Sequence, residues 1–257
     1  DNLFKITFCF FSLLLITTSP NAFSQEVEEV VVTATKKEES TQDIAVSITA
    51  VTADQLAADQ IYDLEDLAEI IPGFGAAKGI GSGSGFVMRG IGSYGVGAAV
   101  VSSIVTSING HSVNPSIMND MGFMDLERIE VLNGPQGTLF GRNSVAGVIN
   151  LITARPTDEF EGYMDYEAGT FEKETVKGAI NMPISDTVRA RLAFMSNVRE
   201  GMVDNPFTGN KMDDRNDQAV RLSIDWDIND KTELKFTYSG QKSDDNRPQE
   251  EVSYCQQ

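Results

Sequence analysis

The residues best suited to chemistry are a glycine-rich loop, one histidine and a group of aspartates. The run from Gly90 to Gly95 (GIGSYG) has the GxGxxG spacing of a dinucleotide-binding loop. Such a loop needs a helix after it and an acid about 20 residues further on. The residues that follow, Val96 to Val101, are a poor helix start, and the next acid is Asp120. The spacing therefore does not predict a nucleotide site.

The sequence supports neither a transition-metal site nor a nucleophilic active site. His111 is the only histidine, no cysteine lies near it in sequence, and a transition-metal site of the usual spacing needs more such ligands. A Ser-His-Asp triad would need a nucleophile elbow, which the sequence lacks. Asp213, Asp214 and Asp217 offer oxygen ligands for calcium without the spacing of an EF-hand. We therefore predict no enzyme, no bound metal and no cofactor.

The charge balance limits which partners the protein can bind. The 257 residues include 38 acids and 20 bases, for a net charge of −18. Nucleic acid binding needs clustered Lys and Arg, so nucleic acid is excluded as the main partner. Hydrophobic residues make up 41% and charged residues 23% of the chain, which is typical of a chain that folds.

An apolar run near the N-terminus has the length of a signal-peptide core. Ile6 to Ile16 follows Lys5 and is too short to cross a bilayer as a helix. Small residues at Ala22 and Ser24 form a cleavage site, so we predict that residues 1–24 are a signal peptide cleaved before Gln25. Cys9 would be removed with it. Cys255 then stands alone, and we expect its partner outside these residues rather than a free thiol.

The leader, residues 25–41, is polar apart from one short patch. Val30 to Val32, with Thr33 and Thr35, has strong strand propensity. So short a patch cannot form a sheet alone. It could add to the open edge of another protein's sheet, or it could form an edge strand of its own domain. The local sequence leaves both possibilities open.

The next region, residues 42–156, is rich in Gly, Ala and Ile and mixes short strands with short helices. Thr52 and Gln55 have the spacing of a capping box at a helix N-terminus. Pro72-Gly73 would end a second helix. In chain order we expect a strand (45–51), the capped helix, a helix from Asp63 to Ile71, a helical turn (125–128), a strand (129–132), a turn (134–137) and a strand (145–153).

From residue 157 onward, apolar and polar side chains alternate. In one stretch Leu222, Ile224 and Trp226 share a face opposite Arg221 and Asp225. Five stretches alternate in this way: 160–168, 175–184, 188–198, 219–228 and 233–241. Each is close to the roughly 9–11 residues of a tilted membrane strand. Since the strands of a soluble β-sandwich alternate too, an exported soluble β-sandwich binding module remains the alternative.

The connections between these stretches favour a membrane barrel over a soluble sandwich. Ser185-Asp186 and residues 229–231 are tight turns, whereas residues 199–216 form a long polar loop. Bacterial barrels alternate short periplasmic turns with longer outer loops in this manner. The predicted export signal points the same way, so we predict strands of a barrel.

Three motifs resemble those of TonB-dependent outer-membrane receptors. Glu29 to Lys37 (EVVVTATKK) looks like a TonB box, and Arg89 to Ser93 (RGIGS) matches the plug motif. The most specific match is Asp125 to Thr157 (DLERIEVLNGPQGTLFGRNSVAGVINLITARPT). Two positions depart from the family pattern: Asn133, where a basic residue is frequent, and Asn109-Gly110, where Asp-Gly is frequent.

The resemblance implies a fold. It would be an α+β plug domain, residues 42–156, followed by the start of a transmembrane antiparallel β-barrel, residues 157–257, which has about 22 strands in the full family. About five strands are present, and at least about eight are needed to close a barrel. We therefore expect the remaining strands outside these 257 residues.

The resemblance also implies a function. Such a receptor imports a scarce extracellular ligand, most often a ferric siderophore or similar metal complex, across the outer membrane of a Gram-negative bacterium, with membrane lipid around its barrel. The periplasmic C-terminal domain of TonB would supply energy by pairing with the box as an added strand. The implied TonB box is Glu29, Val30, Val31, Val32, Thr33, Ala34 and Thr35. The implied charged cluster of the plug, facing the barrel wall, is Arg89, Glu127, Arg128 and Glu130.

Overall fold

A computed structural model of the protein describes residues 31–32, 39–40, 47–59, 61, 63–78, 84–93, 102–113, 123–206 and 208–244. The predicted signal peptide, both cysteines, and Glu29, Val30 and residues 33–35 of the predicted box lie outside these ranges. Within these ranges, no helix has the length and apolar character needed to cross a membrane.

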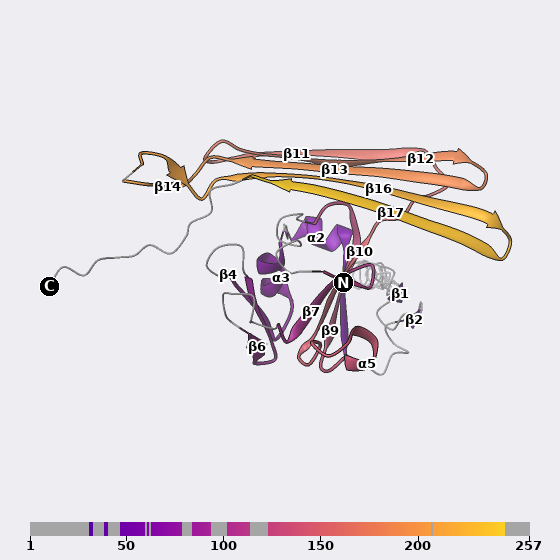
Figure 1. Cartoon of the computed structure of the whole chain (residues 1–257), viewed down its shortest axis with the longest axis horizontal. Coiled ribbons are helices and arrows are strands. Elements are labelled where there is room, and N and C mark those ends of the chain that lie inside the picture. Colours follow the sequence, from indigo (N-terminus) through magenta and orange to yellow (C-terminus); the bar gives the residue numbers. More distant parts are fainter. Residues whose placement is uncertain are drawn as a thin grey trace, which may run out of the picture. The chain divides into compact units, whose positions relative to one another are not determined.

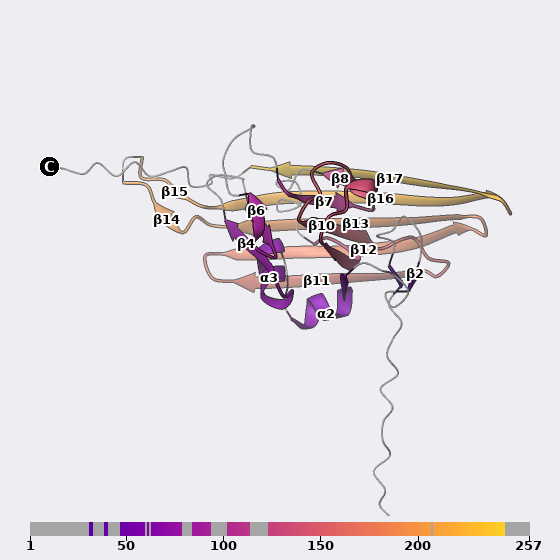
Figure 2. The same ribbon diagram turned by 90° about the horizontal axis from the view of Figure 1, so that it is seen from below.

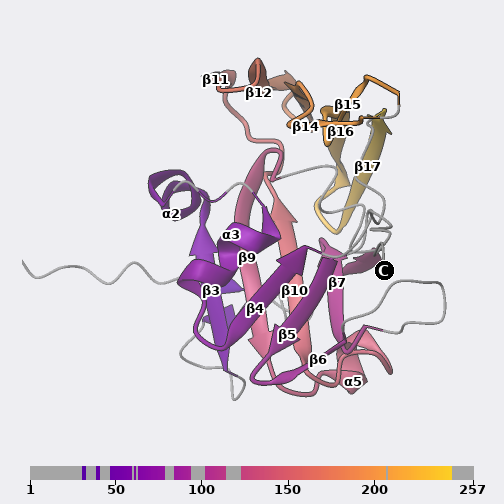
Figure 3. The ribbon, with the colours of Figure 1, turned by 90° about the vertical axis from the view of Figure 1, so that its left-hand side faces the viewer.

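The mixed domain, defined here as residues 47–153, is built on a five-stranded sheet. The strands lie in the order β3 (Ile48–Thr52), β9 (Leu126–Asn133), β10 (Gly147–Thr153), β7 (Ile104–Ile108) and β8 (His111–Val113). Neighbours are antiparallel except β10 and β7, which are parallel. Figure 3 shows β9 and β10 with β3 and β7 on either side. The two strands latest in the sequence therefore lie inside the sheet.

Two short helices begin at capping residues, the first of them at the predicted capping box. Helix α2 (Ala53–Ala58) starts after Thr52, whose hydroxyl accepts from the Gln55 amide at 3.3 Å while the Gln55 side chain accepts from the Thr52 amide at 3.1 Å. Helix α3 (Leu64–Ile70) starts after Asp63, whose carboxylate accepts from the Asp66 amide at 2.8 Å. These bonds satisfy amides that a helix N-terminus leaves without partners.

One face of the five-stranded sheet carries the main apolar core. Leu56 of α2 and Leu64 and Leu67 of α3 pack with Ile129 and Ile149 of the sheet. A three-stranded sheet, made of β4 (Phe74–Lys78), β5 (Ser84–Met88) and β6 (Ile91–Ser93), supplies the rest of the cover. Its Phe74 and Phe86 rings stack with their centroids 5.8 Å apart in the same cluster. Burial of these side chains gives the short elements stability that their length alone does not.

The structure contradicts one local prediction in the mixed domain. The helical turn predicted at residues 125–128 is wrong. β9 starts at Leu126, because its residues pair with β3 and β10, and that pairing overrides the local signal.

The turn between β7 and β8 forms at Asn109-Gly110, with φ of 50° and 76°. Asn followed by Gly is a favoured pair for such a hairpin turn, so this departure from the family pattern preserves the hairpin.

The second part of the chain is a five-stranded antiparallel sheet, called the long sheet below. Its strands follow sequence order: β11 (Glu161–Gly169), β12 (Lys173–Ser185), β13 (Val188–Arg199), β16 (Arg215–Asn229) and β17 (Thr232–Ser243). Figure 2 shows them side by side. Each overlaps one predicted stretch, and β16, with 15 residues, is about 50 Å long at about 3.3 Å per residue.

The connections of the long sheet differ in length as predicted, with short turns at some strand ends and a longer loop at another. Tight turns join β12 to β13 and β16 to β17, whereas the chain between β13 and β16 forms a small hairpin of β14 (Val203–Asp204) and β15 (Lys211–Met212). Figure 1 draws this hairpin beyond the strand ends, away from the two tight turns. In the described part of the chain, the sheet does not close on itself.

Candidate plug–wall site

The long sheet has an apolar face that is exposed and a polar face that is buried along its central strands, β12, β13 and β16. On β16, Trp226 is 45% exposed, whereas its neighbour Asp225 is 4% exposed. The exposed apolar residues that share the face of Trp226 include Met164, Tyr166, Phe194, Val220, Ile228, Leu234, Phe236 and Tyr238. A soluble sandwich buries its apolar face instead. The observed polarity is that of a membrane barrel with a polar interior.

A turn of the mixed domain meets the polar face through Met124 and Asp125. The Asp125 carboxylate is 5% exposed and accepts two hydrogen bonds from Arg191 of β13, at 2.8 Å from Nε and 2.6 Å from Nη2. Tyr163 of β11 donates to the same carboxylate at 3.3 Å. Arg221 of β16 donates to the Met124 carbonyl at 2.9 Å. We call this set the turn anchor. Its paired guanidinium–carboxylate geometry combines charge with direction.

The room for this turn comes from small side chains on the sheet. Met124 is 1% exposed and packs in a cluster with Ala179, Ala193 and Ala219. Ile108 of β7 touches the same cluster. Alanines let the turn approach the strands closely, so the long arginines beside them can reach its backbone and carboxylate.

The linker from the mixed domain to β11 forms a second set of contacts. Asn181 of β12 accepts from the Thr157 amide at 3.0 Å, and its amide nitrogen donates to the Thr157 carbonyl at 2.9 Å and to the Glu159 carbonyl at 2.5 Å. Arg155 forms an ion pair with Asp225 of β16. Arg189 of β13 donates to Asp158 at 3.2 Å. We call this set the linker anchor. It holds residues 155–159 against three strands.

Three of the four residues predicted as the charged cluster come together. Glu130 is fully buried, and its carboxylate accepts from Arg128 Nε at 3.0 Å. Arg128 also pairs with Glu127, which is half exposed. Asn150 of β10 donates to the other oxygen of Glu130 at 3.1 Å and accepts from Ser107 of β7 at 2.8 Å. A buried carboxylate requires such partners, so this polar row fixes the register of β9, β10 and β7.

Arg89 lies in a different place. It occupies the turn between β5 and β6 with a φ of 51°, and it is exposed. Its amide donates to the Gly73 carbonyl at 2.6 Å, and its guanidinium donates to the Ser47 hydroxyl at 3.1 Å. The structure therefore does not bring Arg89 together with Glu127, Arg128 and Glu130 through these contacts.

Of the predicted TonB box, Val31 and Val32 lie in described ranges. They form β1 (Val31–Val32), which pairs antiparallel with β2 (Glu39–Ser40). In these ranges β1 has β2 as its one strand neighbour. Val32 is buried.

The loop between β13 and β16 carries an exposed ion pair. Lys211 of β15 donates to Glu200 at 2.6 Å, and both side chains are exposed. The hydrogen bond from Lys211 lowers the pKa of Glu200, and the same bond raises the pKa of Lys211. Both groups stay charged at neutral pH, so the pair links the base of the hairpin to the end of β13.

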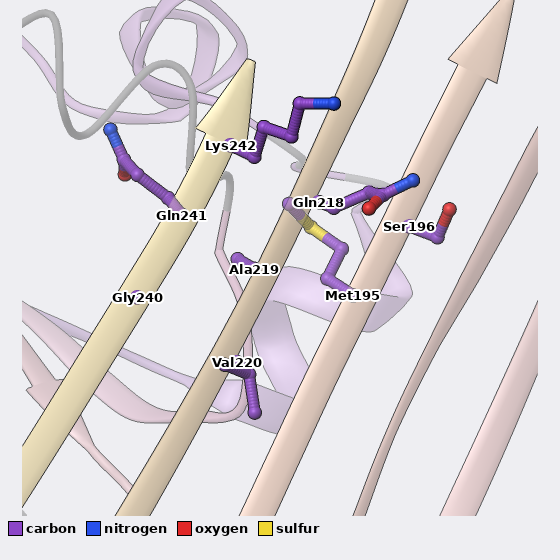
Figure 4. Close-up of a pocket in the computed structure, with 8 residues that line it drawn as sticks. All are labelled: Met195, Ser196, Gln218, Ala219, Val220, Gly240, Gln241 and Lys242. Atoms are coloured by element: carbon purple, nitrogen blue, oxygen red, sulfur yellow. The ribbon is translucent and has the colours of Figure 1, made fainter.

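A shallow hollow lies on the long sheet and does not form a ligand site. It has a volume of about 410 Å³ and lies over β13, β16 and β17. Figure 4 shows side chains such as Met195, Gln218 and Lys242 on these adjacent strands. Its lining mixes residues of both sheet faces. Within the described residues, no group of His, Cys, Asp or Glu is placed to hold a metal ion.

Sequence reasoning missed both anchors. Asp125 and Arg191 are 66 residues apart, and no spacing connects them. A usable signal existed for the polar row: Asn150 interrupts an apolar strand, and a polar residue in a buried strand needs a partner. Arg191 and Arg221 also stand on the polar faces of neighbouring strands, which indicates a charged strip on one face.

The mixed domain is bonded to the polar face of the long sheet, whose other face is apolar. This arrangement is that of a class of proteins, the plugged membrane β-barrels. The comparisons agree: the sequence model for the TonB-dependent Receptor Plug Domain matches residues 40–148. The pesticin receptor of Yersinia pestis is 26% identical over 208 residues, covering 76% of this chain and 29% of that protein. The ferrichrome outer membrane transporter/phage receptor of Escherichia coli is 29% identical, covering 54% and 18%.

Residues 40–148 match the plug domain of TonB-dependent receptors, and the chain is similar to part of the TonB-dependent outer-membrane receptors. The crystal structure of the ferric yersiniabactin uptake receptor from Yersinia pestis has the same fold, with a TM-score of 0.68 and 22% identity over 76% of this chain and 31% of that one. The expected fold class, a plug followed by barrel strands, is confirmed. The mixed domain is the plug, and the long sheet is the first part of the barrel wall. The chain spans less than a third of the length of these relatives.

Proposed function

We propose that this protein imports a scarce ligand, of the ferric siderophore type, across the outer membrane of a Gram-negative bacterium. The observation that carries the proposal is the polarity of the long sheet, with exposed apolar residues on one face and a bonded plug on the other. A lumen filled by a plug must be opened before anything passes. The family is one of receptors and transporters, and the proposal includes no enzymatic reaction.

We propose further that TonB opens the plug by binding residues 29–35 as an added strand. The extended conformation of Val31 and Val32, which pair with β2, supports this, because an added strand must be extended. The outer membrane holds no nucleotide supply, so the energy would come from the inner membrane through TonB. The remaining contacts of this assembly, including those of Glu29 and Thr35, belong to the proposal.

We also assign Glu127, Arg128, Glu130 and Arg89 to the charged face of the plug. The polar row around Glu130 supports this for three of them. Arg89 would join them through the parts of the barrel wall that these strands do not include. The domain boundaries proposed with this assignment are residues 1–24, 25–41, 42–156 and 157–257.

The coupling is tested by binding and uptake measured on one set of variants. Val31→Pro removes a backbone donor and an allowed strand geometry, whereas Val31→Ala keeps both. In a pull-down with the periplasmic domain of TonB, we expect wild type and Val31→Ala to bind and Val31→Pro to lose at least tenfold in affinity. Uptake of radiolabelled ferric siderophore by cells should fall with it, while surface binding of the siderophore stays unchanged. Equal TonB binding by Val31→Pro and wild type would refute the assignment of the box.

A further inference from the structure

The polar face of the long sheet continues beyond the turn anchor, toward the end that carries the β14–β15 hairpin. Along β13, the eight residue steps from Arg191 to Arg199 cover about 26 Å at about 3.3 Å per residue. Along β16, the six steps from Arg221 to Arg215 cover about 20 Å. Figure 1 shows this end of the strands opposite the tight turns. Arg199 and Arg215 therefore lie away from both anchors.

Arg199 and Arg215 are opposite partners in the register of β13 and β16. Both lie on the polar face, because side chains of a strand alternate and an even number of steps separates them from Arg191 and Arg221. The Cβ atoms of such opposite residues are about 4.5–5.5 Å apart, and like charges in this position destabilise the strand pair. Two opposed arginines therefore favour an anion beside them.

Asp213 holds Arg199 in place and balances its charge. The Asp213 carbonyl accepts from Arg199 Nη2 at 2.5 Å, and its carboxylate lies 3.2 Å from the same nitrogen. Asp213 has a φ of 63°, a conformation in which aspartate is more frequent than most residues. Among the described residues, the buried Nε of Arg199 has no hydrogen-bond partner. The guanidinium, which has five donors, is thus fixed in position with donors to spare.

The charge of Arg215 is not balanced in the same way. Its side chain is half-buried, and no residue in the described ranges forms a hydrogen bond or ion pair with it. Asp217, the next residue on the same face of β16, is 3% exposed and accepts from Ser243 at 2.6 Å. Two other bases at this end, Lys173 and Lys211, are each paired with a glutamate. Arg215 therefore leaves a positive charge on the polar face.

We propose that Arg199 and Arg215 form an anion-binding subsite on the inner side of the barrel wall, which takes a carboxylate or another negatively charged oxygen group of the imported ligand. The inference rests on the proposed function, in which the long sheet is the barrel wall and the hairpin end is its outer end. It narrows the ligand to an anionic metal chelate, because a planar guanidinium binds anionic oxygens with paired, charge-assisted hydrogen bonds.

Hydrogen exchange on the full-length protein in detergent tests the subsite. Citrate is the probe because it presents several carboxylates, and sodium chloride at equal ionic strength is the reference because it gives the same screening. We expect citrate to slow amide exchange at the ends of β13 and β16 around Arg199 and Arg215 at least fivefold relative to chloride. Exchange in the tight turn between β16 and β17, at the other end of the strands, should not change.

Two variants with the same loss of charge locate the effect. Arg215→Gln should reduce the citrate effect to less than 1.5-fold. In chloride it should slow exchange at these strand ends at least twofold relative to wild type, because the like-charge contact is gone. Lys242→Gln is the control, since Lys242 pairs with Gln218 on the apolar face near the same end of the sheet. It should keep the full citrate effect.

Either of two results would overturn the proposal. The first is equal exchange of the wild type in citrate and in chloride. The second is an equal citrate effect in Arg215→Gln and wild type, which would place the anion elsewhere on the protein. Since these measurements involve neither TonB nor uptake, their failure leaves the import proposal standing. Loss of TonB binding by the wild type would in turn leave the citrate effect intact.

Discussion

At the scale of single residues, buried charge is the feature that sets the plug apart from an ordinary α+β domain. Glu130 has no exposed surface and makes bonds with Arg128 and Asn150, so its environment supplies the hydrogen bonds that water would otherwise give. Glu127 also pairs with Arg128, but its side chain is 48% exposed. The two acids share one cation and differ chiefly in burial, which makes them a matched pair.

We expect Glu130→Gln to destabilise the centre of the plug by about 2 kcal/mol, because a charged hydrogen-bond acceptor is lost where water cannot replace it. Hydrogen exchange of the β9 and β10 amides measures the corresponding drop in opening free energy. Glu127→Gln is the control and should cost less than about 1 kcal/mol, since exposed ion pairs contribute little. Equal effects of the two substitutions would show that burial does not govern this cluster.

At the scale of elements, the plug depends on close approach between its sheets. A Cβ atom added to Gly147 at the start of β10 would overlap the Met88 sulfur and the Leu132 carbonyl oxygen. Gly137, at the start of helix α5 (Gly137–Phe140), faces open space. One glycine is therefore required by packing between β5, β9 and β10, whereas the other is not.

We expect Gly147→Ala to lower the free energy of unfolding of the plug by about 1–3 kcal/mol, because the strands must move apart to admit the methyl group. Gly137→Ala should stay within about 0.5 kcal/mol of wild type. Resistance of the plug to limited proteolysis in increasing urea measures both. A tolerated Gly147→Ala would contradict the close contact of β10 with Met88.

At the scale of the whole molecule, the polarity of the long sheet defines its surroundings. Ile224 lies midway along the apolar face of β16, and Gln218 lies on the same face near the end that joins the β14–β15 hairpin. The apolar stretch between Val220 and Ile228 covers eight residue steps, or about 26 Å at about 3.3 Å per residue. That length, reduced somewhat by strand tilt, suits the apolar band of an outer-membrane barrel, which is about 25 Å tall.

We expect Ile224→Arg to destabilise the folded state of the full-length protein in lipid vesicles by about 2–4 kcal/mol, because it places a charge near the bilayer centre. Gln218→Arg should cost about 1 kcal/mol or less, since this position lies near the membrane surface. The fraction that folds into vesicles at increasing urea concentrations measures both effects. If the two arginines are tolerated equally, the outer face of β16 does not contact lipid.

The sequence by itself determined the features that depend on neighbours along the chain. The capping box at Thr52, the start of the second helix near Asp63 and the alternation of the five long strands were all predicted, because caps act within three residues and side chains of a strand repeat every two. The motif from Asp125 to Thr157 added the family. Alternation also located Trp226 and Asp225 on opposite faces.

Only the tertiary structure decided which of those faces is buried, since alternation is symmetric between a membrane barrel and a soluble sandwich. It also turned residues 126–128 into strand, through pairing with β3 and β10. The contact of Asp125 with Arg191 and Tyr163 has no local signal at all. It depends on side chains from distant segments meeting in space, and their distance in the chain carries no information about that meeting.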